Sequence, residues 1–338
     1  MSAAEEIVTE APAVEAVPKR AMTLGYGTSL AVLAALIIIP LFVKNFIIFQ
    51  MTMLLIYGLA VLALNILTGG SGQFSLGQSA FYAVGAYTSA ILMEQYNINY
   101  ALTLPVAGVV CFGFGFLFGQ PALRLSGVYL ALATFALATA MPQILKLGFF
   151  EHWTGGVQGL VVTKPDAPFG LPMSQDMWLY YFTLAITIAI YIFSVNLLRS
   201  RSGRAFMAIR DNEIAASAMG IDVATYKTLA FGVSAGITGV AGGLGAIAVQ
   251  FVAPDSYTIV LAISLFLGMV VGGVGWLPGS FIGAAFIIFV PNIAEGISKG
   301  LSGAVFGVLL FLIIFLVPHG ARQVAMVAQQ LLSKVRKT

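Results

Sequence analysis

Long apolar blocks recur along the chain, separated by short stretches rich in charge, glycine, proline or asparagine. Each block is close to the 20 or so residues that an α-helix needs to cross a hydrocarbon core about 30 Å thick. The apolar positions are continuous and do not alternate every second residue, which argues against a membrane β-barrel. The pattern therefore predicts an all-α polytopic membrane protein with about ten transmembrane helices, because lipid offers no hydrogen-bond partners and a helix satisfies its own backbone groups. The predicted spans are residues 26–43, 46–67, 74–93, 101–119, 126–147, 177–198, 228–251, 257–273, 277–294 and 303–318.

Two of these spans, 257–273 and 277–294, are separated only by "GGVGWLPG" and have a second interpretation as re-entrant segments. We read the glycine-rich connection as a tight turn between two helices. The alternative is a hinge that takes part in gating.

The composition excludes a soluble globular domain. Of the 338 residues, 59% are hydrophobic and 9% are charged, and the mean hydropathy is +0.98. A soluble surface would have to expose most of this apolar material to water. Residues 1–25 are acidic and lack a signal-peptide pattern, so we expect a disordered cytoplasmic arm. Cys111 is the single cysteine and lies in an apolar run, where we expect a buried packing thiol.

Lysine and arginine gather on one predicted face of the membrane. With the N-terminus inside, 12 of the 16 basic residues are cytoplasmic and four are outside, which is the usual bias of inner loops. The cytoplasmic set is Lys19, Arg20, Arg124, Arg199, Arg201, Arg204, Arg210, Lys227, Arg322, Lys334, Arg336 and Lys337, and the outer set is Lys44, Lys146, Lys164 and Lys299. We therefore expect both termini, the loop 199–227 and the basic tail 321–338 to be cytoplasmic, and the loop 148–176 to be outside. The net charge of +3 matches an inner membrane face with its lipid headgroups and requires no nucleic acid.

The chain carries no recognisable source of energy. Its acidic residues lie at the ends of predicted helices or in loops, so a proton relay through the membrane is disfavoured. The phosphate-loop pattern G-x-x-x-x-G-K-[ST] is absent, and His152 and His319 lie on different loops without metal-ligand spacing. We expect neither enzymatic activity nor a metal or cofactor in this chain. A channel, or a carrier that binds sodium through backbone carbonyls, remains open.

The predicted cytoplasmic loop 199–227 is far longer than a connection needs. Within it, "DNEIAASAMG" predicts a short helix that is capped by Asp211 or Asn212, has Glu213 in its first turn and ends at Gly220. Such a helix is suited to dock into a cleft on a partner protein. The alternative is a basic loop that contacts anionic headgroups.

The segment "GGSGQFSLGQSAFYAVGAY", residues 69–87, is unusually polar for a predicted span. Its small and hydrogen-bonding residues recur every three or four positions, so on a helix they share one stripe. Such a stripe either packs helices together or lines a hydrated path for a zwitterion. An amide is unfavourable in lipid, so we predict that part of this stripe faces the path. The strongest candidates are Ser75, Gln78, Ser79 and Tyr82, and the weaker ones are Asn65, Thr134, Gln143 and Gln250, of which Asn65 and Gln143 alternatively only hold helices together.

Three ordered motifs resemble a known family. "SGRAFMAIRDNEIAASAMGIDVATYKTLAF", "GGSGQFSLGQSAFYAVGAY" and "MVVGGVGWLPGSFIGAAF" are similar to segments of the permease subunits of bacterial branched-chain amino acid ABC importers, of the LivM type. The resemblance covers about residues 28–320. It implies an ABC importer permease fold in the inner membrane. A urea or short-amide importer permease is the alternative within this class.

The resemblance also implies partners. They are a homologous permease subunit of the LivH type, two cytoplasmic subunits that bind ATP, and a periplasmic substrate-binding protein. The loop 199–227 would then seat in the ATP-binding subunits, and its candidate coupling residues are Arg210, Asp211, Glu213, Ala215, Ala216 and Gly220. In the outer loop, Glu151, Asp166 and Asp176 are available for basic residues of a binding protein.

Overall fold

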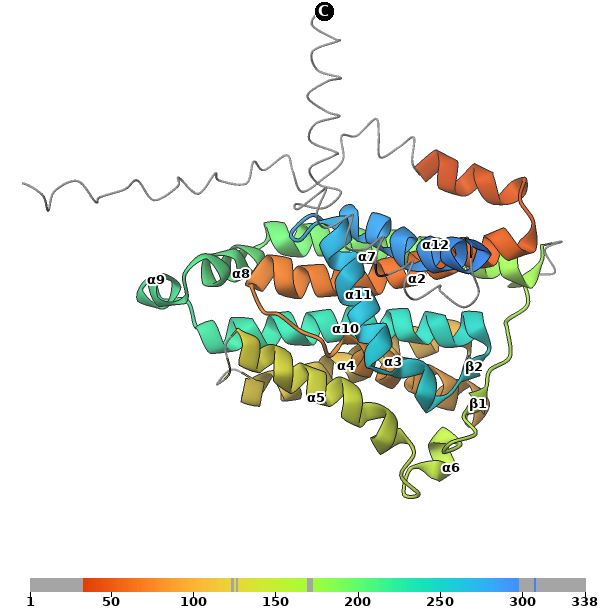
Figure 1. The fold of residues 1–338 in the computed structure, drawn as a ribbon, viewed down its shortest axis with the longest axis horizontal. Coiled ribbons are helices and arrows are strands. Elements are labelled where there is room, and N and C mark those ends of the chain that lie inside the picture. Colours follow the sequence, from red (N-terminus) through yellow and green to blue (C-terminus); the bar gives the residue numbers. More distant parts are fainter. Residues whose placement is uncertain (1–32, 123–124, 126, 169–172, 298–306, 308–338) are drawn as a thin grey trace, which may run out of the picture.

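The computed structural model describes residues 33–122, 125, 127–168, 173–297 and 307, and this part of the chain is predominantly helical (Figure 1). Long helices run side by side along the longest axis of the molecule: α2 (Asn45–Asn65), α4 (Tyr100–Ala122), α7 (Gln175–Arg199) and α10 (Val223–Val249). Helix α2 continues directly into a π-helix, η3 (Ile66–Gly70). The other helices of the bundle are α3 (Gln78–Glu94), α5 (Val128–Leu145), α11 (Ile259–Gly272) after η5 (Pro254–Tyr257), and α12 (Gly279–Ile297).

Helices occupy each of the eight predicted spans between residues 46 and 294. Among the described residues, six helical segments are long and apolar enough to cross a membrane: Asn45–Gly70, Tyr100–Pro121, Val128–Leu145, Gln175–Arg199, Val223–Val249 and Pro254–Gly272. Helix α3 has 17 residues and the apolar part of α12 is also shorter, so the count of about ten membrane helices is not confirmed. Of the predicted span 26–43, residues 33–38 are helical and η2 (Ile39–Leu41) follows. The arm 1–25, the tail 321–338 and, apart from Gly307, the span 303–318 lie outside the described residues.

Helix α10 lies at the centre of the bundle and is the most buried of the candidate spans. Glycines allow its neighbours to approach it, because small residues let helix backbones come close in a membrane. A Cβ atom on Gly85 of α3 would overlap the backbone of Gly239 on α10, and one on Gly115 of α4 would overlap the side chain of Ala235. Cys111 is buried at the same place, with its sulfur 3.4 Å from the carbonyl oxygen of Phe81, so the expected packing thiol is confirmed.

The two long loops lie at opposite ends of the bundle (Figure 1). At one end are α8 (Arg201–Asp211) and α9 (Glu213–Ala218), which belong to the loop 199–227. At the other end are α6 (Glu151–Thr154) and β1 (Leu160–Val161), which belong to the loop 148–176. Strand β1 pairs in antiparallel fashion with β2 (Phe251–Val252), so that Leu160 faces Val252. The distribution of basic residues predicts this opposite placement.

Replacing Gly85 by valine is expected to lower the thermal stability of the protein. The new side chain has to displace the backbone of Gly239, and overpacking of this kind destabilises a core by about 1–3 kcal/mol. Gly113→Ala in α4 is the control, since a Cβ atom there meets nothing within 4 Å. Thermal unfolding of both variants in detergent, followed by tryptophan fluorescence, makes the comparison. Equal melting temperatures would contradict the close contact between α3 and α10.

Candidate functional site

The chain between η3 and α3 is not helical, although it lies inside the bundle. Residues 72–77 have irregular backbone, with Gly72 at a φ of 74°, and Ser71, Gln73 and Ser75 are buried. Irregular backbone at membrane depth is stable only where protein or water pairs its polar groups. The start of the predicted span 74–93 is therefore wrong. Ser75 lies in the break and does not share a helical stripe with the residues of α3.

Polar side chains pair this irregular backbone. Thr68 Oγ1 donates a hydrogen bond to the carbonyl oxygen of Gln73 (3.1 Å). The amide of Leu76 donates to Thr134 Oγ1 on α5 (2.9 Å). Within the break, Ser75 Oγ also accepts from the amide of Gly77 (3.2 Å), so part of the polar character of residues 69–87 stabilises a break between two helices. Thr134, a predicted pathway residue, holds that break in place.

Helix α3 turns its first polar residues toward α10. Gln78 is 1% exposed, and its Nε2 donates to Ser234 Oγ (2.9 Å) while its Oε1 accepts from Thr238 Oγ1 (2.8 Å). Ser79 is buried, and its hydroxyl has no hydrogen-bond partner among the described residues. Within this chain these side chains lie between packed helices. Their contact with a substrate stays a prediction.

The other pathway candidates have very different environments. Tyr82 is buried against the rings of Tyr57 and Tyr257, with centroids 6.3 Å and 5.8 Å away. Gln143 and Gln250 are exposed, and their side chains make no hydrogen bond with described residues. The structure therefore does not bring all the predicted pathway residues together.

Asn65 holds the turn between α11 and α12. Its Nδ2 lies within hydrogen-bond distance of the carbonyl oxygens of Gly273 (3.3 Å) and Trp276 (3.1 Å). The same nitrogen lies 3.3 Å from Ser280 Oγ, and Asn65 Oδ1 accepts from the amide of Gly275 (2.6 Å). The segment "GGVGWLPG" is a tight turn, as predicted, and a buried amide on α2 pairs its backbone. Asn65 thus connects helices, which is the second of its two predicted roles.

A groove of about 490 Å³ opens between α2, α11 and α12, and Gln50, Ser264 and Asn292 are among the residues that line it. The amides of Gln50 and Asn292 make no hydrogen bond with described residues. An unpaired amide in lipid is unfavourable, so this groove is a candidate for a hydrated or protein-covered surface. Isolated amides in the apolar spans 46–67 and 277–294 were the sequence signal for it, and our sequence analysis did not use that signal.

The loop 199–227 contains two helices where the sequence predicts one. Helix α9 begins after Asn212, whose Oδ1 accepts from the amide of Ala215 at 3.0 Å, and Gly220 follows it with a φ of 81°. The predicted helix and its C-terminal glycine are confirmed, and of the two proposed caps Asn212 is the one used. Asp211 is instead the last residue of α8.

Helix α8 was missed because its apolar face is short. Phe206 and Ile209 are buried, and Phe206 packs in a cluster that includes Leu67 of η3 and Phe81 of α3. The apolar pair one turn apart in "RAFMAIRD" was the signal for an amphipathic helix. This burial attaches the loop to the membrane helices instead of leaving it free.

Two charged contacts connect α8 and α9 to the bundle. Arg210 Nη1 donates to the carbonyl oxygen of Gly69 (2.8 Å), and the same guanidinium pairs with Asp211 (2.8 Å). Lys227 of α10 pairs with Glu213 at 2.5 Å, and the lysine side chain is only 10% exposed. Glu213 therefore has a partner inside the chain, which the sequence did not reveal.

Asp222 caps the first turn of α10. Its Oδ2 accepts from Thr225 Oγ1 (2.6 Å), and its Oδ1 accepts from the amides of Ala224 and Thr225. The hydrogen bonds from Thr225 hold the pKa of Asp222 below its usual range. The cap is therefore present at neutral pH and weakens only as the pH falls through that lowered pKa.

Helix α9 presents two large apolar side chains to the outside of the bundle. Ile214 is 83% exposed and Met219 is 84% exposed, whereas Ala216 is buried. Exposed apolar side chains next to a capped helix are typical of an interaction surface. The sequence predicts a docking role for the charged and small residues of this loop, but not for these two.

A family comparison identifies the type of protein. The family described as "Branched-chain amino acid transport system / permease component" matches residues 46–317. The chain belongs to this family. The match includes both the break at residues 72–77 and the helices α8 and α9.

Curated relatives agree with this assignment. The high-affinity branched-chain amino acid permease protein LivM of Salmonella typhimurium is 35% identical over 66% of this chain and 58% of its own length. A probable permease LivH of Methanocaldococcus jannaschii is 26% identical over 62% of this chain and 68% of its own length. The autoinducer 2 import permease LsrC of Escherichia coli DH10B is 28% identical over 75% of this chain and 72% of its own length. The chain spans somewhat less than two thirds of the LivM relatives, and no solved structure matches it.

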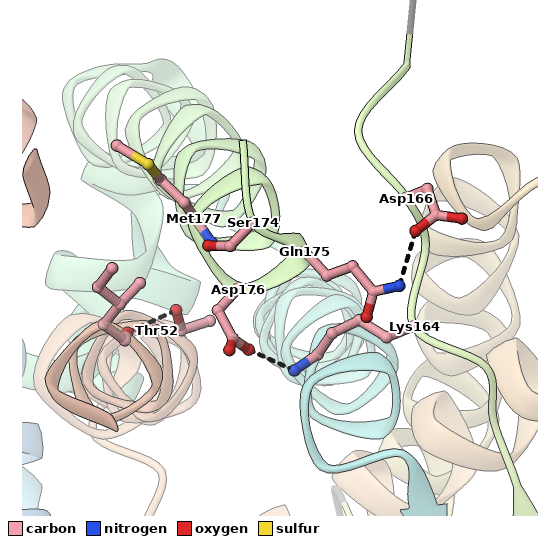
Figure 2. Close-up of polar contacts among 8 residues, drawn as sticks. Thr52, Lys164, Asp166, Ser174, Gln175, Asp176 and Met177 are labelled. Atoms are coloured by element: carbon pink, nitrogen blue, oxygen red, sulfur yellow. Dashed lines mark hydrogen bonds and ion pairs between the residues drawn. The ribbon is translucent and has the colours of Figure 1, made fainter. Parts of the chain in front are cut away.

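The loop 148–176 of this permease-family chain is held to the start of α7 (Figure 2). Lys164 pairs with Asp176 (2.5 Å), and Gln175 Nε2 donates to Asp166 Oδ1 (2.7 Å). Asp166 and Asp176 thus already have partners in this chain, which leaves Glu151 as the predicted acid whose carboxylate has neither a hydrogen bond nor an ion pair among the described residues. Within the described residues, no group of three or more His, Cys, Asp or Glu side chains could hold a metal ion.

Replacing Asn65 by leucine is expected to destabilise the protein. The variant leaves the partly buried amide of Gly275 and the buried carbonyl oxygens of Gly273 and Trp276 without this partner, and a buried group without its partner costs about 1–3 kcal/mol. Gln143→Leu is the matched control because Gln143 is exposed and makes no side-chain hydrogen bond with described residues. Thermal unfolding in detergent measures both. A melting temperature of Asn65→Leu equal to that of Gln143→Leu would show that the hydrogen bonds of Asn65 to the turn do not stabilise the protein.

Proposed function

We propose that this chain is a membrane-spanning permease subunit of an ATP-driven ABC importer that carries branched-chain or related small amino acids across the inner membrane. The observation that carries the proposal is helix α9 in a chain of the branched-chain amino acid permease family. This helix is capped, attached to the bundle by Glu213, and presents Ile214 and Met219 outward. Such a surface is suited to bury its apolar side chains in a partner protein.

The proposed partners follow from the same surface and from the relatives. Two ATP-binding subunits dock on the end of the bundle that carries α8 and α9, and they supply the ATP site. A homologous permease of the LivH type completes the membrane part, and a periplasmic binding protein delivers substrate at the opposite end. In this arrangement the basic loop, both termini and the tail 321–338 face the cytoplasm, in agreement with the bias of inner loops toward lysine and arginine.

The proposed substrate class rests on the LivM relatives and on the neutral character of the polar side chains around Gln78, which are Ser79, Ser234 and Thr238. Neutral amides and hydroxyls bind a zwitterion weakly enough to release it again. Urea or a short amide is the alternative from the sequence, and the similarity to LsrC adds autoinducer 2 as a compound to test. A channel or sodium-coupled carrier is the alternative from another class. Purified chain alone in liposomes tests it, since flux without ATP subunits would refute the importer.

A docking experiment tests the ATP-binding partners. The tagged chain, expressed with its partner genes, is expected to copurify with two nucleotide-binding subunits. Ile214→Asp together with Met219→Asp should reduce their recovery at least about tenfold, because charge in a buried apolar contact is strongly unfavourable.

The control for this experiment is Val157→Asp. Val157 is also apolar and 68% exposed, but it lies in the loop at the opposite end of the molecule. It should leave recovery of the nucleotide-binding subunits unchanged. Full recovery with the double α9 variant would remove the basis of the proposal.

A second experiment asks whether Gln78 contacts substrate or only α10. Gln78→Leu alone leaves Ser234 and Thr238 without their partner, so it should impair stability in either case. Adding Ser234→Ala and Thr238→Val removes the unpaired groups and should restore the melting temperature. We expect uptake of leucine in membrane vesicles to stay at least about tenfold below the wild type in this triple variant, the size of a lost hydrogen bond to substrate. Wild-type uptake by the stable triple variant would show that Gln78 is not part of the path.

A further inference from the structure

The π-helical end of α2 contacts both α8 and the turn between α11 and α12. On one side, the carbonyl oxygen of Gly69 accepts from Arg210 Nη1 at 2.8 Å. On the other side, a Cβ atom on Gly69 would lie 2.5 Å from the amide nitrogen of Gly275 and 2.7 Å from its Cα, so the two backbones are in direct contact. Gly69 cannot move toward the turn without displacing Gly275.

This carbonyl is available because the helix ends at Ser71, before the residue that would donate to it. In an α-helix the amide of Gln73 would bond to Gly69, but here it donates to the carbonyl oxygen of Leu67 (3.4 Å). A carbonyl at a helix end that lacks an N–H partner attracts a cation. Arg210 is oriented for this contact, because its Nε and Nη2 also donate to Asp211 at 3.0 Å and 2.8 Å. Short π-helical segments are frequent at functional positions in helices.

The turn on the far side of Gly69 depends on glycine backbone geometry. Gly273 has a φ of 101° and Gly275 a φ of 79°, a region that glycine enters without strain. Asn65, one turn before Gly69 in α2, holds both residues through its amide. A shift at the end of α2 therefore reaches the start of α12 through backbone contact and through these hydrogen bonds.

We infer that Arg210 is a positioning residue that transmits movement of α8 and α9 through Gly69 to the turn between α11 and α12. It thereby couples ATP hydrolysis in the partner subunits to movement of the membrane helices. This inference rests on the proposed function for the source of the movement, whereas the contacts on which it depends lie within this chain.

The complete transporter in proteoliposomes tests the coupling. Arg210→Ala is expected to keep ATP turnover within about twofold of the wild type and to lower uptake at least about tenfold, which raises the ATP used per molecule imported. Arg210→Lys should restore part of the uptake, because an ammonium group can still donate to Gly69. Arg204→Ala is the matched control, since Arg204 donates only to Arg199 and does not reach η3. An unchanged ratio of ATP to uptake in Arg210→Ala would overturn the inference.

Two adjacent glycines give a second test that does not depend on the arginine. Gly69→Ala places a methyl group against Gly275 and should raise the same ratio, whereas the nearest atom to a Cβ on Gly70 is a methyl carbon of Leu198 at 3.4 Å. The transporter with Gly70→Ala should therefore use the same amount of ATP per molecule imported as the wild type. The same result with Gly69→Ala would also overturn the inference. If the wild-type transporter shows no ATP-dependent uptake, the proposed function fails, and the next measurement decides the inference separately.

Spin labels measure the connection without transport. Cysteines replace the exposed Arg201 and Val274 in a Cys111→Ala background, and pulsed electron resonance gives the distance between α8 and the turn. We expect one narrow distance distribution in the otherwise unchanged full chain, and at least a doubling of its width when Arg210 is replaced by alanine. The same width in both would show that Arg210 does not link the two segments.

Discussion

A broken helix inside a membrane leaves backbone groups that neighbouring side chains must pair, and at residues 72–77 side chains from η3 and α5 take part in this pairing. Thr68 bonds from η3 and Thr134 bonds from α5, while Gln73 in the break donates through its side-chain Nε2 to the carbonyl oxygen of Lys227 on α10 at 3.2 Å. The break is therefore a junction between helices that are far apart in the sequence. Its position next to α8 also explains why the loop 199–227 can contact the membrane helices directly.

The same kind of pairing continues along α3. Thr238 donates to Gln78, Gln78 donates to Ser234, and Ser234 donates to the carbonyl of Ala63 at 2.8 Å. This chain of hydrogen bonds runs across α10, α3 and α2. It can form only because glycines such as Gly85 and Gly239 let the backbones approach. Close packing and buried polar groups are thus one feature of the bundle, since each requires the other.

The spans that carry long uninterrupted apolar runs, such as 101–119 and 177–198, could be predicted because length and hydropathy decide whether a helix enters a membrane. The cap and end of α9 could be predicted because Asn212 and Gly220 act on their own neighbours in sequence. The direction of a polar side chain could not, because it depends on which helix packs beside it. The polar residues of α3 have the same period whether they face α10 or water. Glu213 pairs with Lys227, which is 14 residues away, and this contact depends on how α9 packs beside α10.

The two attachments of the loop 199–227 reach helices in different surroundings. Glu213 pairs with Lys227 on α10, which is packed by glycine contacts against α3 and α4 and is the most buried candidate span. Arg210 bonds to the end of α2, whose far side meets a turn with two glycines at positive φ. The loop 199–227 therefore contacts a deeply buried helix through Glu213 and, through Arg210, a helix end whose far side is in backbone contact with the turn. Because the second contact leads to this turn, the proposed transmission from α8 to α11 and α12 runs through Arg210 and Gly69.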